Sequence, residues 1–167
     1  MENYDWSKFT IKIPIDAGVQ RIYEMLSTRT GMESWFLRLA EFSKADQTPW
    51  GVGSAIEEGD QYRWLWYGYD DDMVETGKIT KANGKDQIQF TFAGNCLVTI
   101  SIYHHKENVS MVELTQENIP ADEESRVKYH LGCMTGWTFY LANLKSILGG
   151  GLDLRNKNVK LQGVINS

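Results

Sequence analysis

The fold is decided by residues 121–148, which read ADEESRVKYHLGCMTGWTFYLANLKSIL. Asp122 stands at the position of a helix N-cap, and Glu123 and Glu124 place negative charge in the first turn, where the helix dipole favours it. Glycines at 149–151 are expected to end the helix. The stretch therefore predicts one long helix of about seven turns.

One face of this helix is broad and apolar. At about 100° per residue, a set of mainly apolar side chains falls in one sector roughly 160° wide. The set is Val127, His130, Cys133, Met134, Trp137, Tyr140, Leu141, Leu144, Ile147 and Leu148. Such a helix needs a wide apolar partner, and the preceding part of the chain alternates as β-strands do. We expect a curved sheet to pack around the helix, with the functional space between them.

Composition excludes several classes of protein. A chain of 167 residues predicts a single domain with a real core. The net charge of −5, without a basic run, argues against a partner with a phosphate backbone. Cys96 and Cys133 lack metal-binding spacing and are expected to be free thiols in a reducing compartment. No leader or long apolar run is evident, so we expect a cytoplasmic protein without membrane insertion, nucleic-acid partner or cofactor.

The beginning of the chain predicts a strand and two short helices. Residues 9–13 alternate between apolar and polar side chains, and Pro14 is expected to end this strand. Asp16 and Thr28 are expected to cap the two helices. The apolar positions of the helices are Val19, Ile22, Tyr23 and Leu26, followed by Met32, Trp35, Phe36 and Leu39.

Residues 41–59 have little periodicity and contain turn signals, so they predict a loop with a short strand at 54–57. A loop of this length is more often a lid or a binding loop than filler. After it, alternating segments joined by short turns predict an antiparallel meander. The strands are expected at residues 62–67, 74–81, 88–92, 96–105 and 109–116, with a hairpin turn at Asn83-Gly84.

Together these elements predict an α+β helix-grip fold. An antiparallel curved sheet of about six or seven strands wraps around the long C-terminal helix, and two short helices follow the first strand. We expect an ordered core over about residues 6–155 and a poorly ordered polar tail over residues 156–167.

Two motifs near the C-terminus support this fold. Residues 136–145 read GWTFYLANLK, and residues 150–155 read GGLDLR. Together they resemble the signature of the bacterial homologues of the heat-shock chaperone ATPase activator, within the START-like (SRPBCC, Bet v-like) superfamily. The resemblance implies a deep cavity between the sheet and the long helix. It implies no single activity, because the superfamily includes lipid carriers, hormone receptors, aromatic cyclases and chaperone partners.

The wealth of aromatic residues indicates either a wide pocket or a heavily packed core. The candidate ligand-binding residues are those expected to face the gap between sheet and helix. They are Trp35, Trp64, Trp66, Phe90, Phe92, His130, Met134, Trp137, Tyr140 and Leu141. The alternative is that these side chains fill the gap themselves, and a register slip of one residue would exchange every strand candidate.

Polar residues within the elements have two interpretations each. His130 is either a ligand contact or, as we favour, a core histidine satisfied by a hydroxyl or a backbone carbonyl. Glu75 and Glu113 face either the cavity or, more commonly, solvent. His104 and His105 project to opposite faces of one strand, so they cannot share a metal ion, and we predict no metal or catalytic site.

Gly132 and Gly136 lie four residues apart on the side of the helix away from its apolar stripe. Each is expected to cost the helix up to about 1 kcal/mol relative to alanine. They predict either a close approach by a lid or a second subunit, or a locally loosened helix.

These patterns predict non-catalytic binding of a small hydrophobic or amphipathic molecule in the central cavity. One alternative is an enzyme, such as a cyclase or a hydrolase, that uses the same cavity. Another is a protein-interaction module related to chaperone ATPase activation or to stress response, with a chaperone as partner. Either a monomer or a homodimer is compatible with the sequence.

Overall fold

The computed structural model describes residues 4–46, 48, 50–51, 53–158, 160–161 and 164. The predicted element order is confirmed, with one additional strand after the second helix. In chain order the elements are β1 (Phe9–Ile15), α1 (Val19–Ser27), α2 (Arg29–Trp35), β2 (Leu39–Ser43), β3 (Gln61–Leu65), β4 (Glu75–Ala82), β5 (Gln87–Phe92), β6 (Cys96–Lys106), β7 (Val109–Glu117), α3 (Glu123–Ser125), η1 (Arg126–Gly132) and α4 (Cys133–Leu148).

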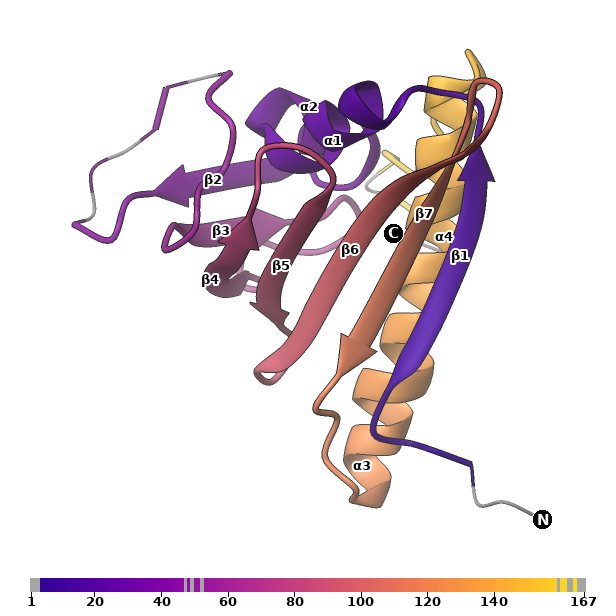
Figure 1. Cartoon of the computed structure of the whole chain (residues 1–167). Helices are drawn as coiled ribbons and strands as arrows, with labels where there is room; N and C mark the ends of the chain where they lie inside the picture. The colour runs from indigo at the N-terminus through magenta and orange to yellow at the C-terminus, as the bar shows by residue number, and fades with distance from the viewer. Residues whose placement is uncertain are drawn as a thin grey trace.

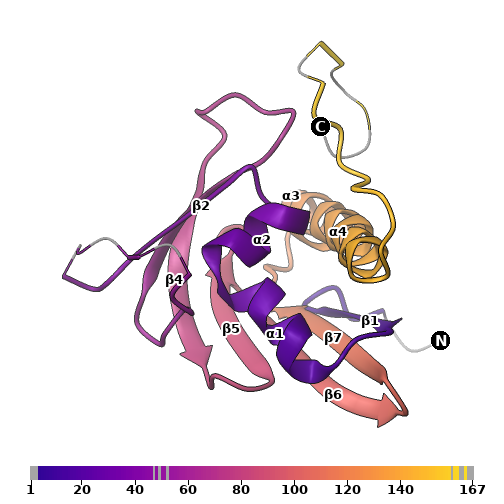
Figure 2. The ribbon, with the colours of Figure 1, turned by 90° about the horizontal axis from the view of Figure 1, so that it is seen from above.

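The seven strands form one antiparallel sheet in the order β1-β7-β6-β5-β4-β3-β2. The first strand therefore joins the last, and β1 and β2 form the two edges. Figure 1 shows a strongly curved sheet with the long C-terminal helix along it, and Figure 2 shows α1, α2 and α4 together on its concave side. This is the predicted α+β helix-grip fold.

The long helix has the predicted extent but is not regular. The Asp122 carboxylate accepts a hydrogen bond from the Ser125 backbone N–H (2.8 Å) and caps the first turn. The segment η1 is a π-helix, and α4 continues from it to Leu148, where Gly150 (φ +76°) follows in the left-handed conformation. The predicted apolar stripe holds along α4, but Val127 is 60% exposed. Because a π-helix turns through a smaller angle per residue, a stripe drawn at 100° loses its phase there.

Several predictions for the N-terminal half are corrected. The strand β1 continues past Pro14 to Ile15, since β1 is an edge strand, where a missing N–H is tolerated. The N-cap of α1 is Gly18 rather than Asp16. Thr28 does cap α2, and its hydroxyl oxygen accepts from the Gly31 N–H (3.0 Å).

The predicted loop at residues 41–59 is also corrected. It begins within strand β2, which pairs with β3 at the edge of the sheet, and Leu39 belongs to this strand rather than to α2. The strand predicted at 54–57 is reduced to a single bridge between Thr28 and Ala55. Residues 47, 49 and 52 of this loop, and part of the predicted tail after 156, lie outside the described residues.

Candidate functional site

An open pocket of about 500 Å³ lies where the sheet meets the long helix. Its walls come from the residue after α2, the β3–β4 loop, the start of β4, the end of β5 and the β5–β6 turn, η1 and the first two turns of α4. The lining residues are Phe36, Trp66, Tyr69, Asp72, Met73, Val74, Glu75, Phe92, Ala93, Gly94, Lys128, Tyr129, Gly132, Cys133, Gly136, Trp137 and Tyr140. The helix contributes the buried Trp137 and Tyr140 together with the two glycines Gly132 and Gly136, so the pocket lies along one edge of its apolar stripe.

One wall of the pocket is a continuous set of aromatic rings. Phe36 is central, with ring centroids 5.0 Å from Trp137, 4.9 Å from Tyr140 and 5.8 Å from Trp66. Phe92 closes the set, 5.2 Å from Trp137 and 6.4 Å from Trp66. Mutual contacts of this kind hold each ring in place, so the wall is preformed for an apolar or aromatic ligand.

Four of the predicted ligand-binding residues line this pocket: Trp66, Phe92, Trp137 and Tyr140. Two of these residues lie where a strand ends: Trp66 directly follows β3, and Phe92 is the last residue of β5. The other six predicted residues lie outside the lining: Trp35, Trp64, Phe90, His130, Met134 and Leu141. These side chains belong to the packed core or lie against it, so the alternative of a filled centre holds for this part of the gap.

Trp64 and Phe90 show why the deep part of the gap is filled. Trp64 stacks on Tyr62 with ring centroids 3.8 Å apart, and it meets Phe90 edge-on at 5.2 Å. Both side chains are fully buried. On the inner face of the sheet, large aromatic side chains thus occupy the space that a deep central cavity would need.

His130 is a core histidine, as the favoured interpretation had it. Its Nδ1 lies 3.0 Å from the Trp6 carbonyl oxygen and its Nε2 lies 2.8 Å from the Tyr4 hydroxyl. A carbonyl only accepts, so Nδ1 carries the proton and donates. The ring is fully buried among Tyr4, Trp6 and Phe9, and it fastens the N-terminal segment to the helix.

The two strand glutamates face opposite sides of the sheet. Glu113 pairs with Lys12 (2.8 Å) on the outer face. Glu75 lies on the inner face opposite Trp64, lines the pocket, and accepts a hydrogen bond from the Ala93 N–H (2.8 Å). Burial raises the pKa of the Glu75 carboxyl, although the Ala93 N–H and the positive charge of Lys128 act in the opposite direction.

Glu75 also holds the turn between β5 and β6. Ala93, Gly94 and Asn95 all have positive φ values there, which is unusual for a non-glycine residue such as Ala93. A Cβ on Gly94 would lie 2.8 Å from the Tyr129 ring, so only glycine allows the turn to approach the helix this closely. The carboxylate and the glycine together fix one rim of the pocket.

Gly132 and Gly136 both line the pocket, which the sequence did not indicate. No described segment of this chain makes the predicted close approach: a Cβ on Gly136 would meet nothing within 4 Å, and one on Gly132 would meet Val127 O of the same helix at 3.5 Å. The approach of a second subunit stays a prediction. The alternative of a loosened helix fits Gly132, which ends the π-helical segment. At Gly136 the missing side chain leaves room in the pocket.

Cys133 presents a protonated thiol to the pocket. Burial raises its pKa to about 11, and the thiol lies 3.8 Å from the Lys128 carbonyl oxygen as a weak donor. A nucleophilic cysteine needs the thiolate, which this surrounding disfavours. The arrangement assigns Cys133 a packing role in the pocket wall.

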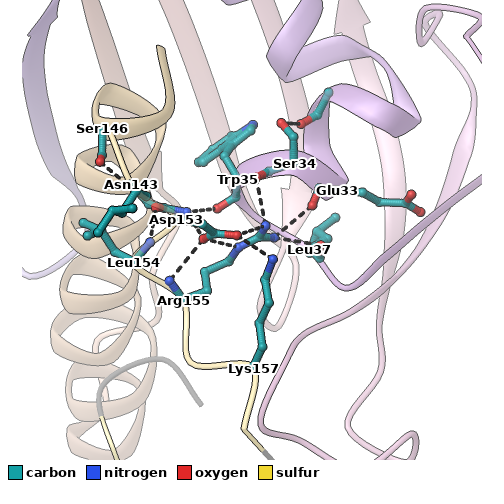
Figure 3. A network of polar contacts seen from close by, with 12 residues as sticks. Glu33, Ser34, Trp35, Leu37, Asn143, Ser146, Asp153, Leu154, Arg155 and Lys157 are labelled. Atoms are coloured by element: carbon teal, nitrogen blue, oxygen red, sulfur yellow. Dashed lines mark hydrogen bonds and ion pairs between the residues drawn. The ribbon is translucent and has the colours of Figure 1, made fainter. Parts of the chain in front are cut away.

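Asn143 of the first signature motif and residues 153–155 of the second form a clamp that lies outside the pocket lining (Figure 3). The Arg155 guanidinium donates to the carbonyl oxygens of Glu33 (3.0 Å), Ser34 (2.8 Å) and Leu37 (3.0 Å) around the end of α2. It also makes a bidentate pair with Asp153 (2.9 and 2.7 Å). Helix ends leave carbonyls without partners, and a cation there also matches the helix dipole.

Asn143 of α4 completes this clamp. Its amide nitrogen donates to the Trp35 carbonyl oxygen (2.7 Å) and to Asp153 (3.1 Å), and its amide oxygen accepts from the Leu154 N–H (2.7 Å). The side chain is fully buried and uses both ends. These parts of the two motifs thus join α2, α4 and the C-terminal segment, which is a structural role. Gly136, Trp137 and Tyr140 of the first motif line the pocket instead.

The fold and this pocket define the class of protein, an α+β helix-grip domain with a pocket between its sheet and its long helix. The family model described as activator of Hsp90 ATPase homolog 1-like protein matches residues 16–149. The chain therefore belongs to this family, as the resemblance of its motifs implied. It has no match among curated proteins.

Solved structures of similar fold come from several organisms. The Aha1 dimer from Colwellia psychrerythraea is 19% identical with a TM-score of 0.60, over 84% of this chain and 95% of that one. An HSP90 activator from Plasmodium falciparum is 18% identical with a TM-score of 0.60, over 86% and 96%. A protein from Staphylococcus saprophyticus is 19% identical with a TM-score of 0.65, over 89% and 96%. At these identities the likeness shows the fold alone.

Two further findings concern only the described part of the chain. None of its helices is a candidate for spanning a membrane. No group of three or more His, Cys, Asp or Glu side chains in it is placed to hold a metal ion.

Proposed function

We propose that this protein binds a small hydrophobic or amphipathic molecule in the pocket between the β3–β4 loop, the β5–β6 turn and the long helix, as a cytoplasmic carrier or sensor. The observation that carries the proposal is the aromatic wall around a space of about 500 Å³. Covering exposed apolar surface stabilises a complex by about 25 cal/mol per Å² before the costs of association. The volume falls within the range of about 300–1,000 Å³ that is usual for small-molecule sites.

We propose no reaction at this pocket. Its described lining holds carboxylates and tyrosines but no histidine. The Cys133 thiol is kept protonated by burial, and burial also raises the pKa of the Tyr140 hydroxyl. A nucleophile paired with a base, which acyl transfer or hydrolysis requires, is not assembled among these residues.

The test uses a neutral fluorescent probe, N-phenyl-1-naphthylamine, titrated into the purified protein. We expect saturable binding at one site. The variant Gly136→Leu places a side chain in open pocket space, so it is expected to weaken binding by about tenfold or more. It replaces a helical glycine with a good helix former, so thermal stability is expected to be unchanged or higher.

The matched control is Thr138→Leu, which adds a similar side chain to the exposed side of the same helix. It is expected to bind the probe as the unsubstituted protein does. If the probe does not bind saturably, or if Gly136→Leu binds it as well as the control does, the proposed pocket function is wrong.

A second candidate function is contact with a chaperone, alone or as a homodimer. The family description favours it, and Val127 and Leu131 on η1 are exposed apolar side chains outside the pocket lining. Stimulation of an Hsp90-type ATPase by both the unsubstituted protein and Gly136→Leu would favour this candidate. A chaperone effect lost together with probe binding would instead link the two functions.

A further inference from the structure

The charged groups of the pocket are arranged by depth. Glu75 is half-buried on the inner face of the sheet, whereas Asp72 and Lys128 are exposed at the rim. The Lys128 ammonium lies over the Tyr129 ring, 5.4 Å from its centroid. Exposed charges are hydrated and screened by salt, so the partly buried carboxylate dominates the field that a bound ligand meets.

The Glu75 carboxylate keeps acceptor capacity free. One oxygen accepts from the Ala93 N–H, and the carboxylate makes no other hydrogen bond or ion pair within the described part of the chain. An ionised carboxylate has room for about four hydrogen bonds. The remaining oxygen is therefore available to a donor that enters the pocket.

Aromatic rings line the same pocket as this carboxylate. Trp66 and Phe92 are only partly buried, unlike Phe36 and Trp137, and both line the pocket. Aromatic faces attract cations, by about 0.5–1 kcal/mol when exposed and about 2 kcal/mol when desolvated. A carboxylate beside aromatic faces is a combination that suits an organic cation better than an anion.

We propose that the ligand of this pocket carries a protonated or alkylated amine, which is placed beside Glu75, on an apolar or aromatic body that lies against Trp66 and Phe92. This rests on the proposed binding function and specifies its ligand class. Lys128 at the rim disfavours a cation modestly, but its exposure leaves the inner position to the carboxylate.

The test compares three ligands with the same phenyl group and nearly the same chain length by isothermal titration at one pH and one ionic strength. They are 4-phenylbutylamine, 4-phenylbutan-1-ol and 4-phenylbutyrate, which are cationic, neutral and anionic. We expect the amine to bind about tenfold more tightly than the alcohol, because a hydrogen bond to a charged group contributes more than one between neutral groups. The butyrate is expected to bind most weakly.

The variant Glu75→Gln removes the charge and keeps an oxygen that can accept from the Ala93 N–H. It is expected to bind the amine and the alcohol about equally, whereas Glu113→Gln on the outer face keeps the preference for the amine. Lys128→Gln is expected to keep or increase that preference. If Glu75→Gln does not fold, the ranking of the three ligands on the unsubstituted protein still decides the proposal.

The outcomes separate the two proposals. If N-phenyl-1-naphthylamine binds but the amine is no tighter than the alcohol, or the butyrate is the tightest, the amine proposal is wrong and the pocket function stands. An amine preference that survives Glu75→Gln also overturns it. If neither the probe nor any of the three ligands binds, both proposals fall.

Discussion

Arg155 connects parts of the chain that are far apart in sequence, and its removal should be among the most damaging single changes. Its side chain is 2% exposed and bonded to three backbone carbonyls and to Asp153. The substitution Arg155→Ala leaves these acceptors unpaired inside the protein. We expect a loss of about 3–5 kcal/mol in the free energy of unfolding, measured by urea denaturation.

The control for this substitution is Arg21→Ala, because Arg21 pairs with Glu24 at 3.5 Å on an exposed helix surface. That pair is worth at most about 1 kcal/mol. Arg155→Lys should also be strongly destabilising, since a single ammonium cannot reproduce the planar fork of donors. An Arg155→Ala protein as stable as the Arg21→Ala protein would show that the clamp is dispensable.

At the scale of elements, the contact between β7 and the irregular part of the long helix depends on Gln116. Its amide nitrogen donates to the Tyr129 carbonyl oxygen in η1 (3.1 Å), and its amide oxygen accepts from the Trp137 indole N–H (3.1 Å). The side chain is fully buried. π-Helices are rare in proteins. Here the Gln116 side chain bonds to one backbone carbonyl of the π-helix and also positions the pocket-lining ring of Trp137.

We expect Gln116→Leu to lower the free energy of unfolding by about 2–4 kcal/mol, because two buried polar groups lose their partners. Relative to the unsubstituted protein, hydrogen exchange in the variant should become faster at the backbone amides of residues 126–136 and change less at those of β6. The control is Gln89→Leu, since Gln89 bonds to Thr99 (2.9 Å) on the outer, half-exposed face. A Gln116→Leu protein with unchanged exchange in the helix would contradict this role.

Elements were predictable where one periodicity runs through them. The alternation within β5, β6 and β7 is such a pattern, and the caps Asp122 and Thr28 each bond to a residue three positions further on, so local sequence suffices for all of them. Strand β2 was missed because it is short: only Ala40 and Phe42 alternate as buried residues about exposed Glu41, which is too brief a pattern to separate from the neighbouring helix and loop. Val127 was misplaced because the helix period changes at η1, which no spacing rule anticipates.

The site was less predictable than the fold, for a physical reason. The sequence indicated which side chains are aromatic, and four of the predicted residues do line the pocket. Whether a ring such as Trp64 fills the centre or lines a cavity depends on the packing of all its neighbours. The β3–β4 loop residues enter the wall through the three-dimensional curvature of the sheet, which leaves no local signal. Glu75 shares the inner face of β4 with the buried Ile79, so the more common solvent-facing interpretation was wrong for it.

At the scale of the whole molecule, two carboxyl groups give opposite contributions to stability as pH changes. Burial acts to raise the pKa of Asp153, but hydrogen bonds from Arg155 and Lys157 outweigh it and hold the pKa well below its ordinary 3.8. The folded state therefore holds the Asp153 proton less tightly than the unfolded state does. Glu75 has the reverse shift, so its contribution increases on acidification.

The contribution of Asp153 is complete above about pH 4 to 5 and is lost as pH falls through 3.8 toward the lower pKa of the folded state. We therefore expect Asp153→Asn to be less stable than the unsubstituted protein at neutral pH, with the difference shrinking as pH falls below this value. Urea midpoints measured from neutral pH to about pH 2.5 test this. Asp70→Asn, in the exposed β3–β4 loop, is the control and should follow the unsubstituted protein throughout.

A difference in stability between Asp153→Asn and the unsubstituted protein that is constant with pH would show that the variant loses packing rather than charge. In that case Arg155 would act on the clamp through its bonds to the α2 carbonyls alone, and the C-terminal segment would owe its position to Asn143.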